Sequence, residues 1–340
     1  MPPLYLVQQG AKIRINNRRV RVEMDPSEAE GSQPEILLQV PIGQVSQVIL
    51  FGNIGLTTPA ISTFLEMGID VVFLTQNGEY RGQLSGGLTP HVPIRRAQYK
   101  CLAEPQFSLR TARGIVSAKL QHQRALLQRR GRELPHQEIQ SAADRLAGAL
   151  QSVDRKTTLQ SLRGLEGAAS AAYFSGFRRL FEPAWNFNTR QRRPPGDPVN
   201  VLLSFGYTLL AHSATGAAQA AGLDPYAGFF HEVVYNRPAL GLDLMEEFRP
   251  VVDGVVLWAC RSEVLTPADF TPGPPERPVV MNDDAKKRFI KAFEERMNRE
   301  FLHPIRQLRL PLRQCLLEQA RQIAARVVEE RAGYQGMGFR

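Results

Sequence analysis

The sequence predicts an α+β protein of two domains, a small β-rich N-terminal domain followed by an all-α domain. Up to residue 88 the apolar residues alternate with polar ones or form short runs rich in Val and Ile, which is typical of strands. Beyond about residue 98 the apolar spacing becomes that of amphipathic helices. A chain of 340 residues is long enough to bury two cores.

The first domain, residues 1–88, is expected to be a small sheet with one helix. The helix is expected at 58–68, because Pro59 suits its first turn and Gly68 suits its C-terminal end. Residues 16–35 indicate a hairpin to which we assign no function, and we place a linker at 89–97. The strand-like segments are 4–7, 12–15, 19–23, 35–40, 45–52, 69–75 and 79–84.

The second domain, residues 98–331, is expected to be helical and to carry the chemistry. Two Pro-rich stretches, 182–200 and 265–280, interrupt it, since Pro does not continue a helix. Residues 332–340 contain three glycines and are expected to form a flexible tail. The helical patterns cover 106–130, 138–152, 160–181, 199–221, 239–249, 284–300 and 305–331.

Composition and charge limit the classes of function. The chain has no apolar run long enough to span a membrane and no signal-like segment after Met1, so we expect a cytoplasmic protein without a membrane partner. Its three cysteines form no CxxC pair, which argues against a disulfide framework or a structural zinc site. Of the net charge of +9, the excess lies in residues 101–200, with sixteen Lys or Arg against eight Asp or Glu. Such a surface favours a polyanion such as nucleic acid, although it could also serve solubility alone.

Glu166 is the first candidate for chemistry. It lies in "LRGLEGAASAAYF", where small residues would let another helix approach closely and leave little room for water. A carboxylate in such a setting is costly unless it is paired or bound to a cation. The alternative is an exposed glutamate in the first turn of a helix, where the helix dipole favours it.

His231 is the second candidate, followed by Glu232 in "HEVVY". The fifth position of this motif holds Tyr235 in place of a second histidine, so the two-histidine zinc site of metalloproteases is excluded. A single histidine could equally be a hydrogen-bonded residue at the edge of the core.

Asp243 and Glu246 are spaced to share one face of a helix. Two adjacent carboxylates repel each other unless a cation lies between them, and the alternative is a set of surface ion pairs with Arg249. A straight helix would put His231 and Glu246 roughly 22 Å apart. Pro238 makes a turn there more plausible, which would bring the histidine back over the carboxylates. Oxygen ligands with one imidazole nitrogen suit Mg²⁺ or Mn²⁺.

The basic segment offers groups that could hold DNA beside such an ion. Trp185 and Phe187 could stack on bases, and guanidinium groups could pair with phosphates; the alternative is a solvated loop anchored by its aromatic residues. The arginines that we expect to bind DNA are Arg163, Arg178, Arg190, Arg192 and Arg193.

Three motifs together resemble a known family. "LEGAASAAYF" at 165–174, "RRPPGDPVNVLLSFGYTLL" at 192–210 and "RPALGLDLMEEFRPVVD" at 237–253 are similar, in order and spacing, to those of the CRISPR-associated spacer-acquisition integrase, the universal adaptation endonuclease of CRISPR systems. The segment from 48 to 84 also resembles the β-domain of that family.

The resemblance implies a homodimer of two-domain subunits that joins a dimer of a small ferredoxin-like CRISPR adaptation protein, with the β-rich domain in dimerisation or partner docking. It implies insertion of short foreign DNA into the repeat array by 3′-OH transesterification, with Mg²⁺ or Mn²⁺, as part of antiviral defence. The family's metal ligands fall on Glu166, His231 and Glu246, and Asp243 takes a supporting position. Two alternatives are a nuclease for branched DNA in repair and a DNA-binding scaffold without catalysis.

Overall fold

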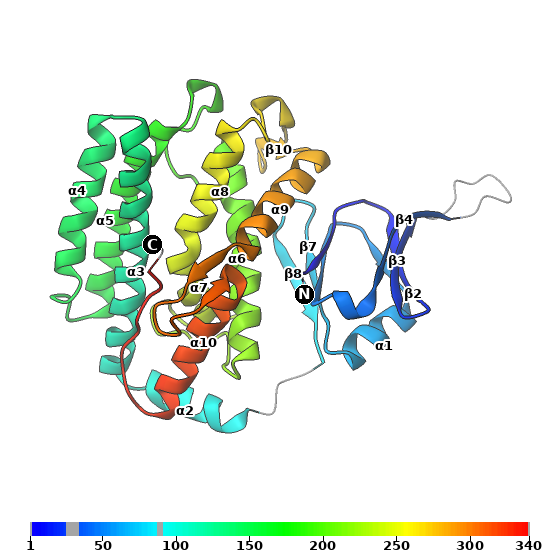
Figure 1. Cartoon of the computed structure of the whole chain (residues 1–340), viewed down its shortest axis with the longest axis horizontal. Helices are drawn as coiled ribbons and strands as arrows, with labels where there is room; N and C mark the ends of the chain where they lie inside the picture. Colours follow the sequence, from blue (N-terminus) through cyan, green and yellow to red (C-terminus); the bar gives the residue numbers. More distant parts are fainter. Residues whose placement is uncertain (1, 25–33, 87–90, 339–340) are drawn as a thin grey trace. The chain divides into compact units, whose positions relative to one another are not determined.

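The computed structural model describes residues 2–24, 34–86 and 91–338. The chain divides into two compact units, one made of residues 1–88 with 281–290 and the other of 89–280 with 291–340. Strands predominate in the N-terminal unit and helices in the other (Figure 1), which confirms the α+β class.

The N-terminal unit contains two four-stranded sheets, in which all seven predicted strands are found. In the first sheet, the strands β1, β5 and β7 are neighbours and run parallel. Strand β8 pairs with β7 in the antiparallel direction. These strands are β1 (Leu4–Leu6), β5 (Gln47–Phe51), β7 (Asp70–Leu74) and β8 (Tyr80–Leu84).

The second sheet has the order β4-β3-β2-β6, and alternation along its strands points one face inward. Ile13 and Val20 are buried in a core that they share with Val48 of the first sheet and Phe64 of the helix. Residues 25–33 of the predicted hairpin lie outside the described residues. The elements are β2 (Ala11–Asn16), β3 (Arg19–Met24), β4 (Glu35–Pro41), β6 (Gly55–Leu56) and α1 (Thr58–Glu66).

The helical unit is built around the long helix α3 (Pro105–Glu133), which packs against α4 and α5 on one side and against the site-bearing segments α7 and α8 on the other. Figure 1 shows α3, α4 and α5 side by side. The remaining helices beyond residue 88 are α2 (Val92–Leu102), α4 (Gln137–Ser152), α5 (Leu159–Phe177), α6 (Pro198–Ala220), α7 (Ala239–Met245), α8 (Arg249–Arg261), α9 (Asp283–Asn298) and α10 (Leu312–Val328). The part of α9 up to residue 290 belongs to the N-terminal unit.

Three parts of this unit differ from the sequence prediction. Helix α2 includes residues 92–97, for which the sequence predicts a linker. Helix α8 includes residues 250–261, for which the sequence predicts neither a helix nor a strand. Each has a proline in its first turn, where no backbone donor is lost, so the proline starts a helix there and does not prevent one. Residues 305–311, expected to be helical, belong to the turn and the second strand of a short hairpin. The hairpins are β9 (Phe270–Pro272) with β10 (Val279–Met281) and β11 (Glu300–Leu302) with β12 (Arg309–Pro311).

The C-terminal segment 332–338 is packed, which differs from the flexible tail expected. It has no regular secondary structure, but Tyr334 and Met337 are buried. The Tyr334 hydroxyl and the Met337 N–H both donate to the buried carboxylate of Glu247, the latter at 2.7 Å. The glycines that suggested flexibility instead allow close packing, because a Cβ on Gly336 would overlap Ala118 of α3.

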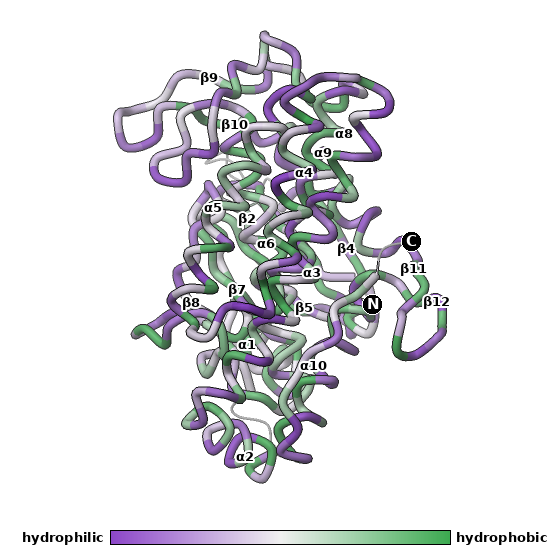
Figure 2. Tube along the Cα trace, turned by 90° about the vertical axis from the view of Figure 1, so that its left-hand side faces the viewer, coloured by the Kyte–Doolittle hydropathy of each residue, from purple (hydrophilic) through white to green (hydrophobic). Residues whose placement is uncertain are grey.

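Hydrophobic and hydrophilic colours alternate along the helices in Figure 2, as expected of amphipathic helices. Among the described residues, no helix combines the length and the apolar character needed to cross a membrane.

Candidate active site

The loop that carries His231 follows α6 and has no helical turn between residues 221 and 238. The chain therefore turns before α7, where Pro238 predicted a break. The guanidinium of Arg163 on α5 anchors this loop, because its Nε and Nη2 donate to the Phe230 carbonyl oxygen at 2.9 and 2.7 Å and its Nη1 pairs with Glu232.

Asp243 of α7 is fully buried and also holds the loop. Its carboxylate accepts the backbone N–H groups of Phe229, Phe230 and His231 at 2.6, 2.9 and 2.9 Å. It also lies 2.8 Å from Nδ1 of His231. A carboxylate oxygen accepts here, so Nδ1 is the donor of this pair, and Nε2 is the ring nitrogen not bound to Asp243. Metal-binding histidines are oriented by a partner of this kind.

Glu246 lies at the start of the short 3₁₀ helix η4 (Glu246–Phe248), between α7 and α8. Its Oε1 is 3.8 Å from Nε2 of His231 and 2.8 Å from Nε of Arg249, and its Oε2 is 2.5 Å from Nζ of Lys119. Burial alone would raise the pKa of Glu246, but the positive charges of Arg249 and Lys119 outweigh it and hold the pKa well below its ordinary value. The carboxylate is therefore ionised. Its ion pair with Arg249 is present, as the alternative interpretation expected, but it is buried and not on the surface.

Glu166 reaches the same point from α5, where it is well inside the helix and not in its first turn. Its Oε1 accepts a hydrogen bond from Ser170 Oγ at 2.7 Å and another from the Lys119 ammonium. Helix α3 packs against α5 and brings Lys119 to Glu166, which agrees with the expectation that another helix lies close. Gly164 and Gly167 are not part of this contact, because a Cβ added at either would meet no atom within 4 Å.

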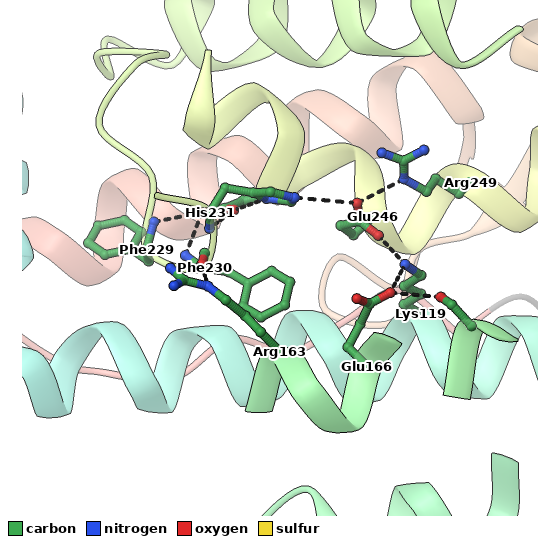
Figure 3. A network of polar contacts seen from close by, with 10 residues as sticks. Lys119, Arg163, Glu166, Phe229, Phe230, His231, Glu246 and Arg249 are labelled. Carbon is green, nitrogen blue, oxygen red and sulfur yellow. Dashed lines mark hydrogen bonds and ion pairs between the residues drawn. The ribbon is translucent and has the colours of Figure 1, made fainter. Parts of the chain in front are cut away.

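Lys119 is a member of the site that the sequence reasoning missed. It projects from α3 with a side chain only 5% exposed, and its ammonium pairs with both Glu166 and Glu246 (Figure 3). A buried lysine is rare unless it is paired. The signal in the sequence was weak, because Lys119 is one of sixteen basic residues in 101–200.

The donor set fits a hard divalent ion, although the carboxylates here surround an ammonium. Within the part of the chain that the structure describes, no three His, Cys, Asp or Glu side chains are grouped closely enough to hold an ion. Glu166 and Glu246 nevertheless supply carboxylate oxygens and His231 a free nitrogen, the ligands that Mn²⁺ or Mg²⁺ accept. In addition, the buried Oε2 of Glu246 has the Lys119 ammonium as its close partner, so it could accept a metal ion where the ammonium leaves.

A second layer of buried groups supports Glu246. Arg249 lies over the ring of Tyr207, with its Cζ 4.5 Å from the ring centroid. The hydroxyls of Tyr207 and Tyr173 donate to the buried carboxylate of Asp253. Burial raises the pKa of Asp253 to about 6, against the lowering effect of these two hydrogen bonds.

The five arginines expected to bind DNA have different surroundings. Arg163 anchors the His231 loop, and Arg178 pairs with Glu138 at 3.0 Å. The guanidinium of Arg190 donates to Asn200 and Ser204 at 2.8 and 3.1 Å, and its role in DNA binding stays a prediction. Arg192 and Arg193 are exposed, and their role in DNA binding stays a prediction.

The proposed stacking role of Trp185 and Phe187 was wrong. Both side chains are buried, Trp185 against Phe270 and Phe187 against Phe177 and Phe181. The loop is anchored by its aromatic residues, as the alternative hypothesis predicted.

Fold and site together define a two-domain α+β protein whose helical unit gathers two glutamates, a histidine and a lysine in one cluster. The model of the family described as CRISPR associated protein Cas1 matches residues 4–295. CRISPR-associated endonuclease Cas1 3 of Thermus thermophilus is 35% identical over 339 residues, covering 99% of this chain and 95% of the relative. The chain belongs to the Cas1 family.

Solved structures show the same fold. A casposase bound to integration product matches with a TM-score of 0.85 and 19% identity, covering 98% of this chain and 93% of that chain. A Cas6-RT-Cas1–Cas2 complex matches with a TM-score of 0.83 and 25% identity, covering 99% of this chain and 36% of that chain.

Proposed function

We propose that this chain is a metal-dependent DNA endonuclease and integrase of CRISPR adaptation, which inserts short foreign DNA into the repeat array. The observation that carries the proposal is that Glu166 from α5 and Glu246 from η4 share one cation, Lys119, while Nε2 of His231 from the loop lies 3.8 Å from Glu246. Three elements distant in sequence contribute these groups, and two adjacent carboxylates need a cation between them.

The relatives support a nuclease. The Thermus thermophilus relative is named an endonuclease, and it aligns with nearly the whole of this chain. The second of the solved structures above is a complex with Cas2, which supports a partner of that kind here. We further propose a cytoplasmic homodimer that joins the small ferredoxin-like adaptation protein and serves antiviral defence.

The chain's own residues would prepare the reaction as follows. Asp243 fixes the imidazole of His231 so that Nε2 faces the carboxylates, and Arg249 keeps Glu246 ionised. A bound divalent ion would polarise the phosphodiester and stabilise charge on the leaving 3′ oxygen. In strand joining, the 3′ oxygen of the incoming DNA forms a bond to phosphorus, and the bond from phosphorus to the 3′ oxygen of the repeat breaks. In cutting, water takes the place of the incoming hydroxyl.

The side chain of Glu166 is 18% exposed, so a phosphate group of DNA can approach it from solvent. The basic segment 101–200, including the exposed Arg192 and Arg193, would hold the phosphates.

The test is a strand-joining assay with a repeat-bearing plasmid, free-ended duplex DNA and Mn²⁺. His231→Ala should lower joining and cutting by at least about a hundredfold while DNA binding is kept. His136→Asn is the matched control, because His136 is exposed and its role as a helix cap is one that Asn can fill. Normal joining by His231→Ala would refute the site. Cutting of branched DNA without joint molecules from the wild-type protein would point to the repair nuclease instead.

A further inference from the structure

Lys119 places a positive charge at the point where the proposed function requires a cation. Its ammonium contacts Oε1 of Glu166 and lies 2.5 Å from Oε2 of Glu246. The side chains of Lys119 and Glu246 are each only 5% exposed, so water screens these charges little. Without a cation between them, the two carboxylates would repel each other.

The carboxylates have other partners that can keep them in place when the ammonium leaves. Arg249 Nε lies 2.8 Å from the opposite oxygen of Glu246, and Ser170 Oγ donates to Glu166 at 2.7 Å. The contact between Lys119 and Glu246 is made by the ammonium alone, 2.5 Å from Oε2 of Glu246, so Arg249 still holds the carboxylate if the ammonium leaves. Lysine also has a flexible stem that permits the ammonium to swing away.

We propose that Lys119 is a built-in counter-ion, which holds Glu166 and Glu246 together before the metal arrives and is displaced from them when the metal binds. The ammonium and a divalent ion cannot occupy the same gap between the carboxylates. Lys119 is thus a positioning residue that competes with the ion, and this inference rests on the proposed function.

The first test compares Mn²⁺ affinity by isothermal titration calorimetry for the wild-type protein and Lys119→Met, whose side chain has similar length but no charge. Lys119→Met should bind Mn²⁺ more tightly by about tenfold or more, because the competing charge is gone, a factor that corresponds to about 1.4 kcal/mol. The metal-free variant should melt at a lower temperature than the wild-type protein, and Mn²⁺ should raise its melting temperature by a larger amount. A merely structural lysine would not give tighter binding when it is removed.

Lys286→Met is the matched control. Lys286 is also 5% exposed and pairs with a carboxylate, that of Asp283 at 2.8 Å, but on α9. Its loss should leave Mn²⁺ affinity unchanged. Equal or weaker Mn²⁺ binding by Lys119→Met would overturn the inference.

Two further measurements separate this inference from the proposed function. Glu166→Gln should abolish Mn²⁺ binding. If the wild-type protein does not bind Mn²⁺, or if Glu166→Gln binds it equally well, the proposed function fails. If Lys119→Met does not fold, amine labelling of the wild-type protein followed by mass spectrometry replaces the titration. Mn²⁺ should then increase the labelling rate of Lys119 severalfold and leave that of Lys286 unchanged. An unchanged or lower rate at Lys119 would overturn the inference.

Discussion

Asp243 and His231 form a buried pair in which one carboxylate fixes both the ring and the backbone of the histidine. The same carboxylate accepts hydrogen bonds from Nδ1 of His231 at 2.8 Å and from the His231 backbone N–H at 2.9 Å. It also accepts the backbone N–H groups of the two preceding residues. The loop and the imidazole are therefore set by a single side chain of α7. This arrangement explains why an acidic residue so near to Glu246 faces the histidine.

Asp243→Asn should impair the site without removing any proposed metal ligand. An amide offers one acceptor oxygen where four N–H groups need two, and its NH₂ group cannot accept from Nδ1. We expect Mn²⁺ affinity and strand joining each to fall by about 10- to 100-fold. Calorimetry and the joining assay measure this, with the exposed Asp144→Asn as control. Unchanged affinity in Asp243→Asn would show that the orientation of His231 does not matter for the ion.

The packed C-terminal segment should contribute to stability. Gly336→Ala would push a methyl group into Ala118 and should lower the free energy of unfolding by about 1–3 kcal/mol. Gly338 has no atom within 4 Å of an added Cβ, so Gly338→Ala should change it by less than about 0.5 kcal/mol. Urea denaturation of both variants measures the difference. Equal stability would mean that the segment does not pack on α3.

Two glycines of α5 give a second matched pair. Gly167 faces open space, so Gly167→Ala should raise the free energy of unfolding by about 0.5–1 kcal/mol, because alanine is the better helix former. A Cβ on Gly176 would lie 2.7 Å from Cβ of Ala142 on α4, so Gly176→Ala should lower it. Denaturation curves showing the same sign for both variants would contradict the packing of α5 described above.

Asp253 should make stability depend on pH. Its pKa is raised from 3.8 to about 6 by burial, so the folded protein keeps a proton that the unfolded chain has already lost. Its contribution is fully present below pH 3.8 and is lost as the pH rises to about 6, by up to about 3 kcal/mol. The free energy of unfolding of the wild-type protein should thus fall relative to that of Asp253→Asn between pH 4 and 6. A constant difference between the two proteins would show that Asp253 is already ionised.

Local pattern was enough to predict the fold class, because strand alternation and helical spacing follow from which side of each element is buried. The pattern failed at α2, which begins in the predicted linker, and at α8, which follows the predicted helix 239–249; Pro93 and Pro250 lie in the first turns of these helices. It also failed for the C-terminal glycines, whose packing against α3 depends on contacts across more than two hundred residues of sequence.

The sequence was enough to predict the two glutamates and the histidine of the site, but not its lysine. Glu166, His231 and Glu246 stand out as polar residues among small or apolar neighbours. Lys119 does not stand out, because a lysine on a helix is ordinarily exposed and only the tertiary structure shows that it is buried. In the same way, the sequence does not show that Arg190 donates hydrogen bonds to Asn200 and Ser204.

Anomalous diffraction at the manganese absorption edge, from crystals grown with Mn²⁺, would locate the ion directly. We predict one strong peak bonded to Nε2 of His231 and to an oxygen of each of Glu166 and Glu246, with the Lys119 ammonium no longer between the two carboxylates. An ammonium still in that gap at saturating Mn²⁺, with the peak absent or on other residues, would contradict the account.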